Sequence, residues 1–182
     1  MLLGTISVDN YKVSTSTTFN FDLVSTSETV ASNDYLEIVL PNDLDSAFST
    51  SGNPTCVVEN AQVSQCLIIS TKVARIVFGA RMTTTTIQGS VSNFVNPASN
   101  RQQSNIQITL KDSHGDARLV SYIGSLTSFE TAGLTVTLST DSNVIGASNA
   151  VLSLEVDPET RMLSDGTLVV NFPMYYENSG SD

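Results

Sequence analysis

Apolar and polar residues alternate in short runs along most of the chain, and this alternation limits the possible folds more than any other feature of the sequence. The clearest runs are residues 19–23, 36–40, 75–78 and 106–110. A period of two places the apolar side chains on one face of a β-strand, and no stretch keeps the spacing of an amphipathic helix. We therefore predict an all-β protein with almost no helix.

Weaker runs, which we also predict to be strands, cover residues 6–8, 56–58, 66–69, 86–91, 117–123, 134–138, 151–156 and 167–172. Turn-forming segments such as 51–54 and 111–116 lie between the runs. Charged residues make up only 14% of the chain, so Ser, Thr and Asn must cover much of the surface, as they do on pleated sheets. Many short strands at this spacing predict an antiparallel β-sandwich of the immunoglobulin-like type.

The charge balance argues against two classes of partner. The formal net charge is −10, and the 182 residues include only 8 lysines and arginines. Nucleic-acid binding depends on cationic side chains that neutralise phosphates, so we expect no nucleic-acid partner. No stretch approaches the roughly 20 apolar residues of a membrane span, so we expect no membrane insertion. Met1 to Gly4 lacks the basic and apolar regions of a signal peptide, so we expect any export signal to be missing from this sequence.

Cys56 and Cys66 flank a short polar segment, and we predict a disulfide across a β-hairpin. Closing a loop of about ten residues stabilises a fold by roughly 2 to 3 kcal/mol in the chain-entropy model. Two buried free thiols are the alternative. A zinc site is disfavoured, because two cysteines and one histidine cannot complete a four-ligand shell. A disulfide indicates an oxidising compartment, so we expect an extracellular or cell-surface location.

Part of the alternating pattern occurs twice, about 132 residues apart. Residues 19–23, followed by a polar spacer and residues 34–41, are matched by residues 152–156, a spacer and residues 165–173. An offset of this size is a domain length. We therefore predict one complete sandwich at residues 1–128 and the start of a second at 129–182, completed by a neighbouring molecule or by missing sequence.

The order of these features also carries a resemblance. An apolar strand ends at Pro41, and the cysteine pair, another apolar strand, residues 87–97 and the run 106–112 follow it. This order resembles the tandem β-sandwich repeats of very large secreted or surface proteins of ciliates and other protists. The resemblance covers roughly residues 5–125, with a second start after residue 133. It implies an extracellular structural or adhesive role.

The sequence offers little for catalysis. His114 is the only histidine, so a Ser-His-Asp or Cys-His arrangement would have to use it as the base. It lies in the turn-forming segment 112–116, and we predict an exposed turn residue. A Gly-x-Ser-x-Gly elbow, a phosphate-binding glycine-rich loop and a His-Glu-x-x-His helix are absent from the sequence. We therefore expect no enzyme activity, no catalytic residues and no cofactor.

Three pairs of acidic residues lie close together in the sequence, namely Asp43 with Asp45, Asp112 with Asp116, and Asp157 with Glu159. Calcium at a loop or domain junction is one interpretation, since this hard cation prefers several oxygen ligands. None of the pairs has the spacing of an EF-hand loop. Solvated acidic turns are the favoured interpretation, and we predict no metal site.

Hydroxyl-rich tracts are candidate positions for O-linked glycans. They are Ser14–Thr18, Ser46–Ser51 and Thr83–Thr86. We expect no N-linked glycan, because Asn53-Pro54-Thr55 carries the forbidden proline. These tracts also suit the ordinary surface of strands and turns, and that interpretation is favoured.

Together these features favour a structural repeat module of an extracellular filament or cell-surface coat, with a homo-oligomer or a filament of like domains as the partner. An isolated pair of strands is marginal in water, so the second repeat needs strands from elsewhere. The predicted assembly contacts are Leu152, Leu154, Val156, Leu168, Val170, Phe172, Tyr175 and Tyr176. The alternative is an adhesin domain that binds a glycan or protein ligand, with calcium as a further ligand.

Overall fold

The computed structural model describes residues 2–25, 29–42, 46–98, 105–123, 126, 130, 133–141, 151–159 and 167–171. Every regular element in these residues is a β-strand, which confirms the all-β prediction. The strands are β1 (Leu2–Val8), β2 (Ser16–Ser25), β3 (Tyr35–Val39), β4 (Ala47–Phe48), β5 (Cys56–Val58), β6 (Val63–Ser70), β7 (Val73–Phe78), β8 (Thr86–Val95), β9 (Ile106–Lys111), β10 (Ala117–Ile123), β11 (Leu134–Thr140) and β12 (Leu152–Pro158).

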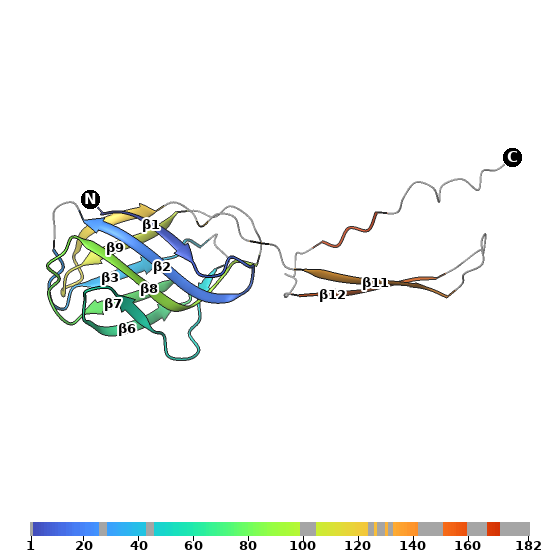
Figure 1. Ribbon diagram of the computed structural model, residues 1–182, viewed down its shortest axis with the longest axis horizontal. Helices are drawn as coiled ribbons and strands as arrows, with labels where there is room; N and C mark the ends of the chain where they lie inside the picture. The colour runs from blue at the N-terminus through green and yellow to red at the C-terminus, as the bar shows by residue number, and fades with distance from the viewer. Residues whose placement is uncertain are drawn as a thin grey trace.

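Strands β1 to β10 form two five-stranded antiparallel sheets (Figure 1). The first sheet has the order β1-β2-β8, and β4 and β5 both pair with the remaining edge of β8. The second sheet has the order β10-β9-β3-β7-β6. The two sheets face each other across one apolar core, an arrangement that is consistent with a β-sandwich.

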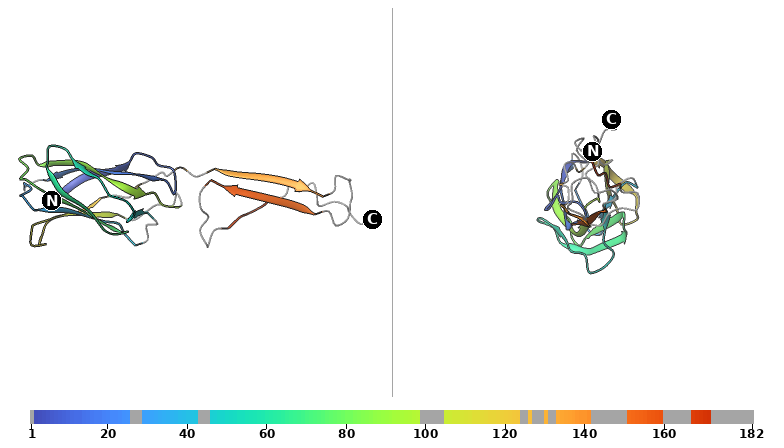
Figure 2. Two further views of the ribbon diagram at one scale, coloured as in Figure 1. Left: turned by 90° about the horizontal axis from the view of Figure 1, so that it is seen from below. Right: turned by 90° about the vertical axis from the view of Figure 1, so that its right-hand side faces the viewer.

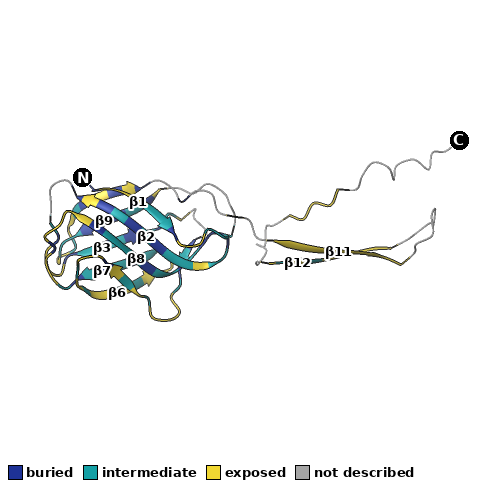
Figure 3. Ribbon diagram, in the orientation of Figure 1, coloured by how far each residue is buried: buried dark blue, intermediate teal, exposed yellow. Residues whose placement is uncertain are grey.

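Alternate residues of the predicted runs supply this core, as the colouring by burial shows (Figure 3). The fully buried side chains include Phe19 and Leu23 of β2, Leu36 and Ile38 of β3, Ile76 and Phe78 of β7, Phe94 of β8, and Ile108 and Leu110 of β9. The rings of Phe19, Phe48 and Phe94 pack with centroids 5.4 to 6.1 Å apart. Burying each large apolar side chain stabilises the fold by about 1.5–3 kcal/mol.

Gly89 allows three strands to approach closely in the middle of the first sheet. It lies on β8 between Phe21 of β2 and Val58 of β5. A Cβ atom at this position would lie 2.3 Å from the carbonyl oxygen of Val57 and 2.8 Å from the Phe21 ring. A larger residue would therefore force the backbone or the ring to shift.

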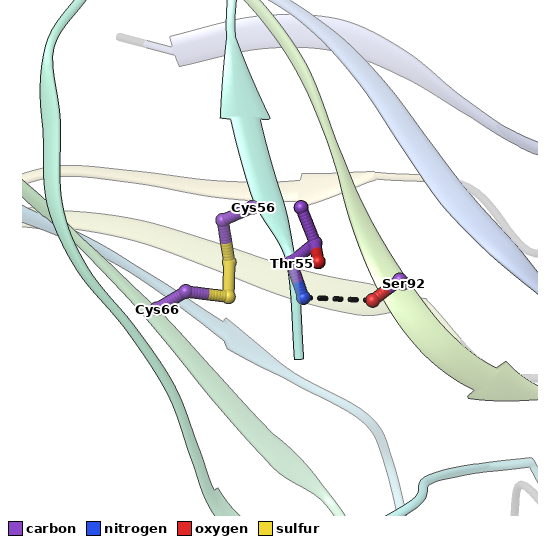
Figure 4. The surroundings of a disulfide bond; sticks show 4 residues. All are labelled: Thr55, Cys56, Cys66 and Ser92. Carbon is purple, nitrogen blue, oxygen red and sulfur yellow. Dashed lines mark hydrogen bonds between the residues drawn. A yellow bond between two sulfur atoms is a disulfide. The ribbon is translucent and has the colours of Figure 1, made fainter. Parts of the chain in front are cut away.

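The disulfide joins Cys56 of β5 to Cys66 of β6, with the two Cα atoms 5.4 Å apart (Figure 4). The cysteines pair as predicted, but the prediction of a hairpin disulfide is wrong, because β5 belongs to the first sheet and β6 to the second. β5 pairs with β8 instead of β6. Thr55 N donates to Ser92 Oγ at 2.8 Å and Glu59 N donates to Gln88 O at 2.8 Å, one bond at each end of β5. The bond thus links the two sheets.

β11 and β12 form a separate two-stranded antiparallel sheet. This hairpin lies beyond one end of the two larger sheets in both views that show the length of the molecule (Figures 1 and 2). Leu126, the last buried residue of the first core among those that the structure describes, is 3% exposed. The division predicted at residues 128 and 129 falls in the stretch between Leu126 and the hairpin, and the identity of the hairpin as a second repeat stays a prediction.

Most predicted strands are present, with ends that differ by a few residues. β4 is absent from the predicted set, because two residues are too few to produce an alternation. The predicted strand at 167–172 is wrong for residues 167–171, which lie in no strand. An isolated extended segment cannot satisfy its backbone hydrogen bonds within a sheet unless a neighbouring strand pairs with it.

Candidate functional site

Residue 130 connects the hairpin segment to the loop between β1 and β2. Glu130 N donates to Tyr11 O at 2.8 Å, and Val13 N donates to Glu130 O at 3.0 Å. The two bonds make a parallel β-bridge between Glu130 and Lys12. The loop of the first unit therefore holds the chain shortly before the second pair of strands begins.

Asn96 fixes the conformation of this loop. Its side chain is buried, and its Nδ2 atom donates to the carbonyl oxygens of Asn10 at 2.6 Å and Lys12 at 2.7 Å. Its main-chain N–H donates to Thr15 O at 3.0 Å. A buried amide with this set of partners orders both ends of the loop, so the loop presents Lys12 to the hairpin in a defined conformation.

An ion pair between Lys12 and Glu159 links the loop to the end of β12. Gly133 N also donates to Glu159 Oε2 at 2.7 Å. The hydrogen bond from Lys12 and, with a smaller effect, the bond from Gly133 hold the pKa of Glu159 below its ordinary value. Both side chains of the pair are partly exposed, so salt screens their attraction and the pair contributes orientation more than stability.

The β11–β12 hairpin has one apolar and one polar face, which follow from its register. The apolar face carries Leu134, Val136, Leu138, Leu152, Leu154 and Val156, with Pro158 and Thr140 at its two ends. The polar face consists of Thr135, Thr137, Ser139, Ser153, Glu155 and Asp157. Leu138 is 59% exposed and Leu152 is 45% exposed, so the apolar face is uncovered. A contiguous exposed apolar patch of this kind is typical of an interaction surface.

The predicted assembly contacts fall into three groups. Leu152, Leu154 and Val156 lie together on the apolar face of β12. Leu168 and Val170 are exposed, in the stretch that forms no strand. Phe172, Tyr175 and Tyr176 lie outside the described residues. The structure adds the apolar residues of β11, which the sequence analysis leaves out although their alternation is visible in the run 134–138.

A second group of interacting side chains lies on the outer face of the second sheet. Arg75 donates to Glu37 Oε2 at 2.8 Å, and Lys111 donates to Glu37 Oε1 at 2.5 Å. The Arg75 guanidinium also lies 4.4 Å from the centroid of the Tyr35 ring. Partial burial by itself raises the pKa of Glu37, but the bonds from Lys111 and Arg75 outweigh it and lower the pKa. The cluster joins β3, β7 and β9 and resembles a structural ion-pair network.

A polar hollow of about 330 Å³ lies on the outer face of the first sheet. Its polar lining comes from β2, β8 and the end of β5, with Asn20, Asp22, Gln88, Ser90 and Glu59. Gln88 Nε2 donates to Asp22 Oδ2 at 2.7 Å, so this bond engages the Asp22 carboxylate, one of two in the hollow together with Glu59. The hollow offers hydrogen-bonding groups for a polar ligand and no nucleophile paired with a base.

His114 lies in the turn between β9 and β10 and is exposed, as predicted. The turn is organised by Asp112, whose Oδ1 atom accepts the main-chain N–H groups of Asp116 and His114, both at 2.9 Å. These bonds lower the pKa of Asp112, and the bond from Asp116 has the largest effect. The local geometry explains both residues as parts of a turn.

The three acidic pairs have separate outcomes. Asp43 and Asp45 lie outside the described residues. The Asp112 carboxylate is bonded within its own turn, and Glu159 is paired with Lys12. Among the described residues, no group of three or more His, Cys, Asp or Glu side chains is placed to hold a metal ion.

Thr83, Thr84, Thr85 and Thr86 are exposed before and at the start of β8. An enzyme that adds O-linked glycans would reach their hydroxyl groups, and glycosylation there stays a prediction. Within the part of the chain that the structure describes, no helical segment has the length and apolar character needed to span a bilayer.

Comparison with protein-family models gives no match, and comparison with curated proteins gives none either.

Proposed function

We propose that this chain is a structural repeat module of an extracellular filament or cell-surface coat, which joins its neighbours through β-sandwich contacts. The observation that carries the proposal is the uncovered apolar face of the β11–β12 hairpin, attached to the end of a folded unit. Apolar surface exposed to water is unfavourable, so a contact in which a neighbouring unit covers this face is stabilised. No enzyme activity is part of the proposal.

The fold we propose is immunoglobulin-like. In the immunoglobulin fold, strands A, B and E share one sheet and strands G, F and C share the other. Here β1, β2 and β8 are neighbours in the first sheet, and β10, β9 and β3 are neighbours in the second. The β6–β7 hairpin extends the second sheet beyond β3. These adjacencies support the assignment.

An extracellular location is supported by the disulfide between the sheets, because thiols stay reduced in most intracellular compartments. The proposed unit at residues 1–128 contains both five-stranded sheets, and the proposed second repeat at 129–182 contains the hairpin. In a filament, the apolar face of each hairpin would be covered by the next unit. A head-to-tail contact that does not close on itself propagates.

Truncation after residue 130 tests this function. The truncated chain keeps the bridge between Glu130 and Lys12 but lacks the hairpin. We expect the truncated protein to be folded and monomeric, and the full chain to associate, as measured by circular dichroism and light scattering. A full chain that stays monomeric, or a truncated chain that associates equally well, would contradict the proposal.

The alternative function, an adhesin domain, is favoured by the polar hollow on β2, β5 and β8. Its amide and carboxylate groups suit a glycan or a polar segment of a protein ligand. Thermal melting with and without a chelator tests the calcium version, because a bound ion stabilises only the state that binds it. A melting temperature that falls in chelator would favour the adhesin.

A further inference from the structure

The hairpin β11–β12 repeats the hairpin β1–β2 in register. Residues 2–8 of β1 pair without a shift with residues 25–19 of β2, and residues 134–140 of β11 pair without a shift with residues 158–152 of β12. Leu2 and Leu134 are 132 positions apart, Phe19 and Leu152 are 133 apart, and these two offsets convert the whole first register into the second. The register adds to the sequence pattern, because it shows which residues of β11 and β12 lie opposite each other.

Hydrogen bonds and side chains support the same alignment. Asp9 N donates to Thr18 O, and at the equivalent positions Asp141 N donates to Val151 O, both at 3.2 Å. Three residues of β1, Leu2, Thr5 and Ser7, recur unchanged as Leu134, Thr137 and Ser139. Asp9, directly after β1, recurs as Asp141 after β11. The β11–β12 hairpin is thus built as the opening pair of strands of another sandwich.

The first unit shows what pairs with such a hairpin. β8 pairs antiparallel with the edge of β2 that faces away from β1. Ser25 N donates to Thr85 O at 2.8 Å, so alternate residues of β2, including Phe21, direct their backbone groups toward β8. In β12 the bonds at Val151 and Glu159 point toward β11. Backbone groups alternate in direction along a strand. The N–H and C=O groups of Leu152, Leu154 and Val156 therefore lie on the other edge of β12.

That edge of β12 has no strand beside it in the described part of the chain. Residues 167–171, which follow β12, lie in no strand. A folded second copy does not offer its own β8, because β8 is already paired with β2 on one side and with β4 and β5 on the other. The strand that fits this edge is therefore one that is not already enclosed in a complete sandwich.

Side-chain chemistry at the first edge indicates what the incoming strand carries. Gln88 of β8 lies opposite Asp22 of β2 and donates to its carboxylate at 2.7 Å. Glu155 occupies the position equivalent to Asp22 and keeps a carboxylate on the polar face. The incoming strand therefore needs a hydrogen-bond donor, an amide or a cation, opposite Glu155.

We propose that the open edge of β12 is a docking site for a β-strand that has the pattern of β8. It pairs antiparallel with residues 152–156, turns alternate apolar side chains toward the apolar face of the hairpin, and places an amide or cationic group opposite Glu155. Strand addition of this kind derives affinity from main-chain bonds and specificity from alternate side chains. The inference rests on the proposed function, since it identifies the edge through which the module is completed.

A labelled synthetic peptide of residues 83–93 provides the probe, titrated with the full chain and followed by fluorescence anisotropy. We expect saturable binding in the register of β2 and β8. In that register the amides of Ile87 and Gly89 face the acceptor strand, and those of Gln88 and Ser90 face away. N-methylation of the first pair should weaken binding roughly tenfold or more, because two main-chain bonds are lost. N-methylation of the second pair is the matched control and should not weaken it.

Charge exchange tests the register. A peptide with Gln88→Glu places two carboxylates opposite each other and should bind roughly fivefold more weakly. Glu155→Lys in the full chain should restore its binding, and Asp157→Lys, two residues along the same face, should not. Circular dichroism establishes that both variants keep their fold. Absence of saturable binding, equal effects of the two methylation patterns, or equal rescue by both lysine variants would overturn the proposal.

The outcome separates this inference from the proposed function. If the full chain associates through its hairpin but the peptide does not bind, only the strand-docking inference fails. If the peptide binds with the expected register but the full chain and the truncated chain behave alike, the edge is a docking site and the filament proposal fails.

Discussion

Glu37 occupies the middle of β3 and has two cationic partners, Arg75 and Lys111. Its side chain is 13% exposed, while Arg75 and Lys111 are 31% and 25% exposed. Ion pairs at this depth are screened less than those on the surface. The two cations lie on opposite sides of β3, on β7 and β9, so Glu37 connects three neighbouring strands.

Glu37→Gln should lower the free energy of unfolding at neutral pH by about 1 to 2 kcal/mol, because the charged hydrogen bonds from Arg75 and Lys111 lose their anionic acceptor. The pKa of Glu37 is lowered in the folded state from an ordinary value of 4.5. The stabilisation is therefore present above that value and is lost as the pH falls below it. Urea denaturation at several pH values should show the two proteins converging in acid. Glu59→Gln, at an exposed position, is the control, and a difference that persists in acid would contradict the assignment.

At the scale of strands and turns, the disulfide between β5 and β6 is the one disulfide cross-link between the two sheets in the described residues. β5 is only three residues long and pairs with β8 through a short register. Its attachment to the sandwich therefore depends on few main-chain bonds. The disulfide adds a constraint at a strand that would otherwise open easily.

Replacing both cysteines by serine should lower the free energy of unfolding by about 2 to 3 kcal/mol, the value expected for a closed loop of this length. Thermal and urea denaturation measure the effect, and hydrogen exchange should show faster opening of β5. A reducing agent should destabilise the natural protein and leave the serine variant unchanged. Equal stability of the two proteins would show that the sheets hold β5 without the bond.

The sequence predicts strands better than it predicts how they pair. The runs around Phe21, Ile38 and Ile108 are strands because alternation alone buries one face. The cysteines were sufficient to predict a bond, but the sheet that each joins depends on the contacts of β5 with β8, which connect residues far apart in the chain. Likewise, the pattern at 152–156 indicated an assembly surface, whereas its register with β11 and its open edge required the structure.

At the scale of the whole molecule, the same apolar pattern is buried in the first unit and exposed in the hairpin. Phe19 and Phe21 of β2 are 0% and 3% exposed, and their equivalents Leu152 and Leu154 are 45% and 36% exposed. The difference is the absence, in the described residues, of a sheet that covers the hairpin. A two-stranded sheet is marginal in water, so in the proposed filament the apolar face of the hairpin would be the contact between units.

Leu138→Asp should reduce association of the full chain, because it places a charge in the middle of the apolar face opposite Leu154. Leu138 is exposed, so the substitution should leave the first unit folded. Ser139→Asp adds the same charge to the polar face and is the matched control. Sedimentation velocity over a range of concentrations measures the mass of each variant, and circular dichroism monitors the fold. Burial of a carboxylate in an apolar contact is costly, so Leu138→Asp should weaken association roughly tenfold or more, and Ser139→Asp should not. Equal association of the two variants would show that copies meet through another surface.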